Sequence, residues 1–204
     1  MKPHRVFIAI NLPEEAKEEL LAYKNKWPEL LASPTRLDPA ERAGGPARWT
    51  TKENLHLTLA FLGNTSDQEL EEVCSVIKQV GARHQPLSIE FNKIVYGPLR
   101  LRSGQAPRMI WAVAEPASSA DKLLELQKDV VQTLHVEQEQ NFTPHLTLAR
   151  LKAFELQGME LEEMPDVNEE VSISFEVKSI EVMESRLRRS GAEYTTIQSF
   201  MLKE

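Results

Sequence analysis

Two short stretches of the chain alternate polar and apolar residues and share five identical residues in a row. Residues 55–60 read Leu-His-Leu-Thr-Leu-Ala, and residues 144–149 read Pro-His-Leu-Thr-Leu-Ala. Such alternation is typical of a half-buried strand, in which residues i and i+2 face the same side of the sheet. Each stretch therefore predicts a strand that buries its leucines and presents one imidazole and one hydroxyl on the opposite face. These polar pairs are His56 with Thr58 and His145 with Thr147.

The rest of the pattern predicts helices and strands around the two copies. Apolar residues at helical spacing predict helices over 13–27, 66–83 and 116–134. Further strands are expected over 6–10, 87–96, 109–115, 171–183 and 193–202, beside the copies at 54–62 and 143–151. We therefore expect an α+β protein of two pseudo-symmetric lobes, each a mostly antiparallel sheet backed by helices. A pseudo-twofold axis would place the two His-Thr faces in the cleft between the lobes.

Two segments interrupt this pattern within what we expect to be a single domain over residues 1–204. Residues 28–48 hold a third of the twelve prolines and a Gly-Gly pair, which predicts a loop, either a lid or an insertion without function. Residues 152–170 carry seven acidic side chains against one lysine, which predicts a solvated connector. Two arginine clusters, one flanking a predicted strand and one at a predicted turn, could form a rim for phosphate groups or simply be solvated: Arg100, Arg102 and Arg108, and Arg186, Arg188 and Arg189.

Composition narrows the class of protein. The 204 residues are 41% hydrophobic and 27% charged, as in ordinary globular proteins, and the net charge of −7 argues against a broad surface for long nucleic acid. A small basic pocket for one phosphate stays possible. The single cysteine, Cys74, excludes an intramolecular disulfide and fits a reducing compartment. No apolar run approaches the roughly 20 residues of a membrane span, so we expect a cytoplasmic protein without membrane or obligate protein partner, most simply a monomer.

The duplicated His-x-Thr pair suits chemistry at phosphorus. Two facing imidazoles can act as acid and base near neutral pH, and threonine hydroxyls can donate hydrogen bonds to phosphoryl oxygens without adding charge. Such an in-line displacement requires no metal or other cofactor. A single histidine on a strand is usually structural, but packing alone does not require the same imidazole and hydroxyl twice. Zinc would need three or four protein ligands, and neither motif supplies a carboxylate or a second histidine.

The paired motifs resemble the 2H phosphoesterase superfamily, and their surroundings resemble its RNA 2′,3′-cyclic phosphodiesterase (LigT-like, ThpR) family. The matching segments, spread over nearly the whole chain, are residues 5–10, 54–63, 107–111, 144–150 and 191–194. The resemblance implies hydrolysis of a 2′,3′-cyclic phosphate at an RNA 3′ end, leaving a 2′-phosphate. It also implies that His56 donates a proton to the departing 3′-oxygen and that His145 accepts one from water. The residues themselves are symmetric and do not assign these roles.

The resemblance implies further substrate contacts. Thr58 and Thr147 would hold the phosphate, and Phe61 and Arg150 would contact the substrate. Strict alternation places Phe61 and Arg150 on the leucine face, so they reach the cleft only if each strand ends or bulges there.

Several functions fit the same pocket. The leading expectation is metal-independent hydrolysis of RNA 2′,3′-cyclic phosphate ends. The same site could instead act on small cyclic-phosphate nucleotides or join RNA ends through a 2′-5′ linkage by the reverse reaction. A non-catalytic module that binds nucleotides or RNA ends is the alternative from another class.

Overall fold

The computed structural model describes residues 3–31, 47–99, 106–114, 118–137, 142–152, 164–188 and 191–203. The helical segments in these ranges are α1 (Glu14–Ala22), η1 (Tyr23–Lys26), α2 (Pro28–Leu31), η2 (Lys52–Asn54), α3 (Asp67–Gly81) and α4 (Ser118–Thr133). The strands are β1 (His4–Asn11), β2 (Ala47–Trp49), β3 (His56–Thr65), β4 (Leu87–Gly97), β5 (Met109–Val113), β6 (His145–Leu151), β7 (Asn168–Val177), β8 (Ser179–Arg188) and β9 (Gly191–Met201).

The strands form one antiparallel sheet that is organised as two halves. Its order is β7-β4-β5-β6-β3-β1-β8-β9, and β2 pairs with β6. We call β3, β1, β8 and β9 the first half and β6, β5, β4 and β7 the second half. The two halves join at the centre, where the motif strands β3 and β6 pair through Leu57 and Leu146. The expected α+β class and the two antiparallel lobes are confirmed.

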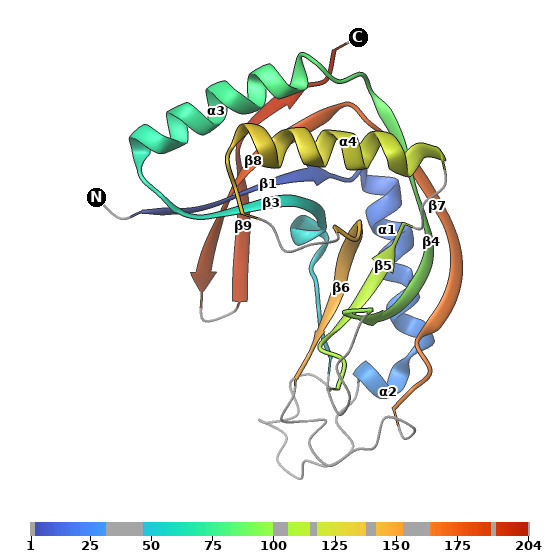
Figure 1. The fold of residues 1–204 in the computed structure, drawn as a ribbon. Helices are drawn as coiled ribbons and strands as arrows, with labels where there is room; N and C mark the ends of the chain where they lie inside the picture. The colour runs from blue at the N-terminus through green and yellow to red at the C-terminus, as the bar shows by residue number, and fades with distance from the viewer. Residues whose placement is uncertain are drawn as a thin grey trace.

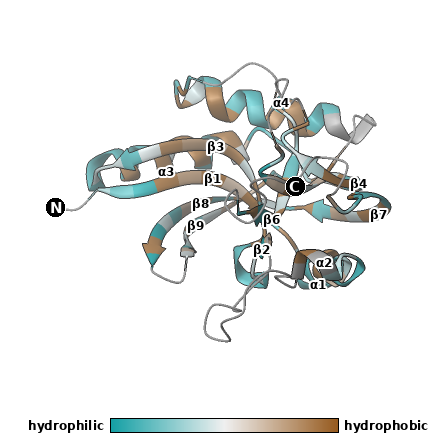
Figure 2. Cartoon of the chain, turned by 90° about the horizontal axis from the view of Figure 1, so that it is seen from below, coloured by the Kyte–Doolittle hydropathy of each residue, from teal (hydrophilic) through white to brown (hydrophobic). Residues whose placement is uncertain are grey.

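Helices cover the sheet and bury one continuous apolar core. α3 and α4 contact each other, α3 packs on β8 and β9, and α4 packs on β3 and β4 (Figure 1). α4 and the α1–α2 segment lie on opposite sides of β4 and β7 (Figure 2). A capping box begins α3, because the Ser66 hydroxyl accepts from the Glu69 backbone N–H and the Glu69 carboxylate accepts from the Ser66 N–H. The fully buried leucines of both motifs lie in this core.

Several predicted boundaries were wrong. The helix expected over 13–27 ends at Ala22 and continues as a 3₁₀ turn, and β3 runs on to Thr65 because Gly63 adopts a positive φ of 76° within the strand. The segment expected to be loop over 28–48 contains the short α2 and the start of β2. Residues 32–46 of that loop and residues 153–163 of the acidic connector lie outside the described residues.

The C-terminal strands also differ from the prediction. The strand expected over 171–183 is two strands, β7 and β8, and Lys178 alone separates them. β7 begins at Asn168, inside the expected connector, and Met164 and Val167 are buried rather than solvated. Arg186 and Arg188 lie in β8 and not in a connection. β7 pairs with β4 and β8 pairs with β1, so the chain passes from the second half to the first within one residue.

Candidate active site

The two motif strands place the four predicted polar residues on one face of the sheet. Because β3 and β6 are antiparallel and Leu57 pairs with Leu146, His56 lies opposite Thr147 and Thr58 lies opposite His145. All four are half-buried, whereas both leucines are fully buried on the other face. The structure therefore brings the two copies together around a local pseudo-twofold axis.

Both histidines are oriented by the same backbone contact. His56 Nδ1 lies 2.8 Å from the Asn54 carbonyl oxygen, and His145 Nδ1 lies 2.8 Å from the Thr143 carbonyl oxygen. A carbonyl can only accept, so each Nδ1 carries the proton and donates it. In the neutral ring, each Nε2 is then the acceptor that remains for chemistry.

The aromatic surroundings of the two rings differ. His145 stacks on Trp111, with 3.8 Å between ring centroids and 23° between planes. His56 meets Tyr194 edge-on, with 4.8 Å between centroids and 80° between planes, and also contacts Phe7. The twofold relation therefore holds for the backbone contacts of the histidines but not for the rings that support them.

Burial makes both imidazoles weak bases. Burial, together with the smaller effects of the Arg150 and His145 charges, lowers the pKa of His56 to about 4, and the hydrogen bond to Asn54 opposes this shift. Burial and the charge of Arg150 also lower the pKa of His145. Both rings are therefore neutral near pH 7 in the free protein. An anion between them would favour their protonated forms and raise both pKa values.

A β-bulge at the same place in each copy turns Phe61 and Arg150 toward the histidines. On β1, consecutive Ile8 and Ala9 pair with Ala60 and Thr58, so β3 has one extra residue. On β5, consecutive Ile110 and Trp111 pair with Ala149 and Thr147, so β6 has one extra residue as well. Strict alternation fails at both bulges, and residues beyond them change face. Phe61 and Arg150 consequently share the face of the His-Thr pairs.

Each bulge has a specific hydrogen-bond donor for its irregular backbone. Gln127 of α4, itself buried, donates to the Leu59 carbonyl at 3.4 Å. In the other copy, the Thr50 backbone N–H donates to the Leu148 carbonyl at 2.8 Å, and its hydroxyl donates to the Thr147 carbonyl at 2.7 Å. A buried carbonyl without a partner is costly, so these contacts stabilise the bulged form of both strands.

Three residues that sequence reasoning gave no role support the histidines. Trp111 stacks on His145, and Tyr194 contacts His56. The Asn54 amide donates to the Ala192 carbonyl at 2.9 Å and accepts from the Tyr194 N–H at 3.2 Å, which fastens the start of β3 to β9. Trp111 and Tyr194 lie in segments that carried the family resemblance, but no pattern in the chain indicates the contacts of Asn54.

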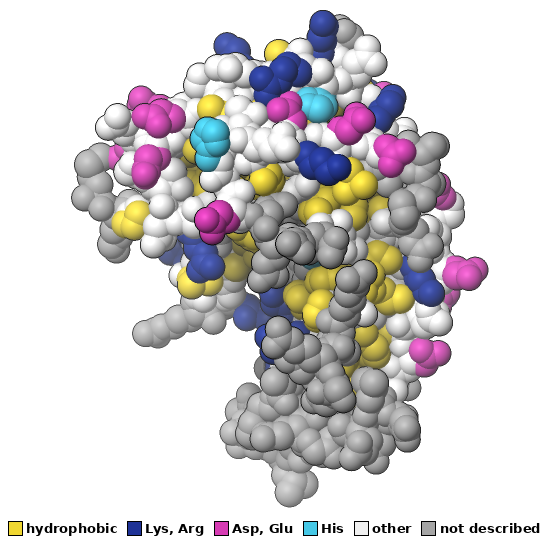
Figure 3. Space-filling model, viewed as in Figure 1, with side chains coloured by type: hydrophobic (Ala, Val, Ile, Leu, Met, Phe, Trp, Pro, Cys, Tyr) yellow, Lys and Arg dark blue, Asp and Glu magenta, His cyan; other side chains and the backbone are white. Residues whose placement is uncertain are grey.

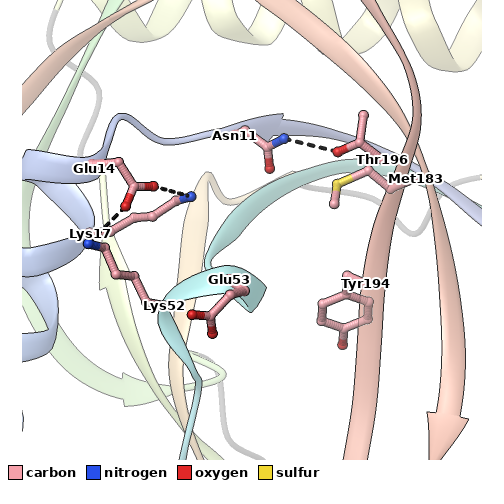
Figure 4. Close-up of a pocket in the computed structure, with 8 residues that line it drawn as sticks. All are labelled: Asn11, Glu14, Lys17, Lys52, Glu53, Met183, Tyr194 and Thr196. Atoms are coloured by element: carbon pink, nitrogen blue, oxygen red, sulfur yellow. Dashed lines mark hydrogen bonds and ion pairs between the residues drawn. The ribbon is translucent and has the colours of Figure 1, made fainter.

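A pocket of about 320 Å³ has Tyr194, which contacts His56, in its wall (Figure 4). Its lining residues are Asn11, Glu14, Lys17, Lys52, Glu53, Met183, Tyr194 and Thr196. Lys17 pairs with Glu14, and Lys52 pairs with Glu14 and with Glu18. Because acidic side chains already neutralise these cations, the pocket is a poor site for a phosphate. The face that carries the histidines is the better one, since Arg150 there is exposed and positively charged.

The remaining candidates lie elsewhere or are already paired. Arg186 and Arg188 form ion pairs with Glu184 and Glu193, and Arg100, Arg102 and Arg189 lie outside the described residues. Among the described residues, no three side chains of His, Cys, Asp or Glu converge in a geometry that could hold a metal ion. None of the helices described is both long and apolar enough to cross a membrane.

A two-lobed antiparallel sheet with one inward-facing His-x-Thr pair per lobe defines the class of two-histidine phosphoesterases. The chain belongs to the 2′-5′ RNA ligase superfamily, whose sequence model matches residues 13–189.

Known relatives agree with this membership, and a solved structure shares the fold. The chain is 32% identical to an RNA 2′,3′-cyclic phosphodiesterase of Aeropyrum pernix, over 78% of this chain and 89% of the relative. It is 26% identical to the protein of that name from Methanocaldococcus jannaschii, over 96% of this chain and 99% of the relative. The crystal structure of Escherichia coli LigT complexed with 3′-AMP has the same fold, with a TM-score of 0.70 and 23% identity over 99% of both chains.

Proposed function

We propose that this protein hydrolyses the 2′,3′-cyclic phosphate at an RNA 3′ end to a 2′-phosphate by acid–base catalysis with two histidines and without a metal. The observation that carries the proposal is the cross-strand pairing of the duplicated motif, which turns two identically oriented imidazoles to one face. The names of the relatives support the same reaction. Because one chain supplies both halves of the site, the reaction requires no partner subunit, and a cytoplasmic monomer is the simplest form.

The geometry suits an in-line displacement at phosphorus. The Thr58 and Thr147 hydroxyls would donate to the non-bridging oxygens of the phosphate. Neutral His145 would accept a proton from water at Nε2 as the water oxygen bonds to phosphorus. The bond from phosphorus to the 3′-oxygen would break on the opposite side, and protonated His56 would donate its Nε2 proton to that oxygen. The negative charge of the bound phosphate would raise the low pKa of His56 and so supply the protonated form.

Two residues beyond the bulges would bind the substrate around the reacting phosphate. Arg150 is exposed, and its charge lowers the pKa of both imidazoles, so it lies close enough to attract an anion held between them. The Phe61 ring is 72% exposed, next to Phe7 at the edge of the same face. An exposed aromatic ring beside the site suits stacking of a base.

The test is hydrolysis of an RNA with a 2′,3′-cyclic phosphate end in excess EDTA, with identification of the product isomer. We expect a 2′-phosphate, and replacement of either His56 or His145 by Ala should lower kcat by about 100-fold or more. His84→Ala is the matched control, since His84 is also half-buried but pairs with Asp129 far from the site. Loss of activity in EDTA would contradict the metal-free reaction, and near-full rates in both site variants would contradict the assignment.

The same preparation separates the alternatives. Turnover of a 2′,3′-cyclic mononucleotide but not of an RNA end would indicate a small-nucleotide enzyme. Formation of a 2′-5′ linkage from two RNA ends would indicate that the reverse reaction is favoured. Binding of the RNA end without turnover would identify a non-catalytic module.

A further inference from the structure

The structure assigns a role to Arg48 that depends on the proposed function: beside Arg150, which lies at the reacting phosphate, Arg48 binds the phosphodiester on the 5′ side of the terminal nucleotide of the RNA. The short strand β2 places Arg48 directly opposite Arg150 on β6. Residues paired across an antiparallel ladder face the same side of the sheet. Arg48 therefore lies on the face that carries the two histidines.

The neighbours of Arg48 confirm this orientation. Ala47 is buried in the core, and Trp49 packs against the same core and stacks on Trp27. Arg48 lies between them on the strand and is exposed. Alternation along β2 thus separates the core side from the site side, and the guanidinium is on the site side.

Two arginines directly opposite each other repel unless an anion lies between or beside them. Within the described ranges, no carboxylate forms an ion pair with either Arg48 or Arg150, although the nearby Arg186 and Arg188 each have one. This arrangement is unusual in a chain with a net charge of −7. On the face shown in Figure 3, acidic and basic side chains are interspersed over the upper part of the molecule. Two arginines that have no carboxylate partner among the described residues therefore point to an anionic ligand.

Arg48 also reaches across the junction between the halves. A β-carbon added to Gly191, the first residue of β9, would lie 1.9 Å from Arg48 Nη2. The absence of a side chain at Gly191 therefore lets the guanidinium lie against the β8–β9 end of the first half. Gly191 is one residue before Ala192, whose carbonyl accepts from Asn54, so the same segment that fastens the start of β3 also contacts Arg48.

The position of the two arginines divides their roles. The charge of Arg150 acts on both imidazoles, so Arg150 belongs with the reacting phosphate. The charge of Arg48 does not contribute to the pKa shift of either histidine, and Arg48 lies on β2, the strand next to β6, on the same face. An RNA chain that enters this face would bring its next phosphodiester to Arg48, whose planar guanidinium can donate two hydrogen bonds to a phosphate. A cyclic mononucleotide has no such phosphate, so Arg48 would favour oligonucleotide ends.

The test compares three substrates with the same terminal cyclic phosphate: a mononucleotide, a dinucleotide, and the dinucleotide with an uncharged methylphosphonate linkage. In the wild-type protein, we expect a higher kcat/KM for the dinucleotide than for the mononucleotide. Arg48→Ala should lower the ratio of these values roughly tenfold, and the methylphosphonate should lower it similarly in the wild type. Combining both changes should lower it no further, because the two changes remove one interaction.

Control variants separate binding from general effects. Arg188→Ala removes an exposed, ion-paired arginine of the same region and should leave the ratio unchanged. Arg48→Gln keeps much of the side-chain stem and should reproduce the effect of Arg48→Ala if that variant folds poorly. An equal loss on mononucleotide and dinucleotide, or a loss that persists with the methylphosphonate, would overturn the role of Arg48.

Failure of the proposed function would give a different result, namely no turnover of any substrate by the wild type. Affinities for a 3′-phosphorylated dinucleotide and its methylphosphonate analogue would then test Arg48 alone. Tighter binding of the charged linkage by the wild type, lost in Arg48→Ala, would support the phosphate site. Equal affinities would refute it.

Discussion

We expect Gly97, the last residue of β4, to affect the position of His145 through Trp111, which contacts both. Trp111 stacks on His145 on one side and packs against Gly97 on the other. A β-carbon at Gly97 would lie 2.3, 2.6 and 2.8 Å from three carbons of the Trp111 indole. Gly97→Ala therefore adds one methyl group that would press on Trp111, the ring that stacks on His145.

The size of the effect follows from these distances. Carbon atoms are in favourable contact at about 3.5 Å or more, so the indole must retreat by roughly 1.2 Å. Trp111 is only 8% exposed, and the imidazole lies 3.8 Å away on its far side, so the displacement passes to His145. Overpacking of this kind costs about 1–3 kcal/mol of folding stability, and a misplacement of about 1 Å can cost on the order of 100-fold in rate.

The assay measures kcat for hydrolysis of a cyclic phosphate and Tm for the same preparations. Gly97→Ala should lower both. Gly81→Ala is the matched control, since its β-carbon would lie 2.9 Å from the Met201 carbonyl oxygen, remote from the site, and should lower Tm while leaving kcat near wild type. A Gly97→Ala protein with lower Tm but unchanged kcat would refute the idea that Trp111 positions His145.

Four further predictions concern titration and the link to β9. The pH dependence of kcat/KM reports pKa values in the free protein, and that of kcat reports those in the substrate complex. Because the pKa values of His56 and His145 are lowered in the free protein, kcat/KM should reach its maximum at a lower pH than kcat. Maxima at the same pH would count against protonation induced by the bound anion. Because the pKa of His56 is about 4 in the folded protein, the unfolded chain binds a proton at this residue first as the pH falls from 6.5 to about 4, and this lowers the folding stability. His56→Ala should therefore make the fall of Tm between these pH values less steep. Asn54→Ala removes both side-chain hydrogen bonds to β9 but keeps the backbone carbonyl that orients His56. We expect roughly a tenfold loss in kcat/KM and a modest loss of Tm. An unchanged kcat/KM would show that the link to β9 does not position His56. Hydrogen bonds to Glu184 and Asp67 raise the pKa of His4, so its contribution to stability is present below pH 6.5 and lost as pH rises through the raised value; His4→Ala should lower Tm at pH 6 more than at pH 8.5.

The repeat and its alternation were enough to predict which residues meet. Period-two patterning gives the face of each residue, and the identity of the copies implies equivalent places in the fold, so the pairing of the two motif strands could be expected. The bulges could not be read from the pattern. Each register change falls within an apolar pair, Leu59-Ala60 or Leu148-Ala149, so the polar and apolar pattern does not mark it. The donors that stabilise the bulges, Gln127 and Thr50, lie far from the bulged residues in sequence.

The C-terminal region shows a signal that was present but not used. Between residues 171 and 183, the residues that join the main apolar core fall on odd positions up to Val177 and on even positions at Ile180 and Val182. This change of phase marks the end of one strand and the start of another, and the predicted single strand over 171–183 ignored it. By contrast, no local pattern indicates that β2 pairs with β6 or that Arg48 lies opposite Arg150. β2 has only three residues and follows a proline-rich segment, so it is too short to show a periodic pattern.

The chain order of the strands determines when the site can form during synthesis. The strands of the second half, from β4 to β7, emerge from the ribosome as one uninterrupted piece. β1 and β3 emerge earlier, yet the pairing partners that complete their half are β8 and β9, which follow β7 in the chain. Asn54 can fasten the start of β3 only after residues 192 and 194 have been added. A nascent or truncated chain that ends before them contains both histidines but lacks this hold on His56.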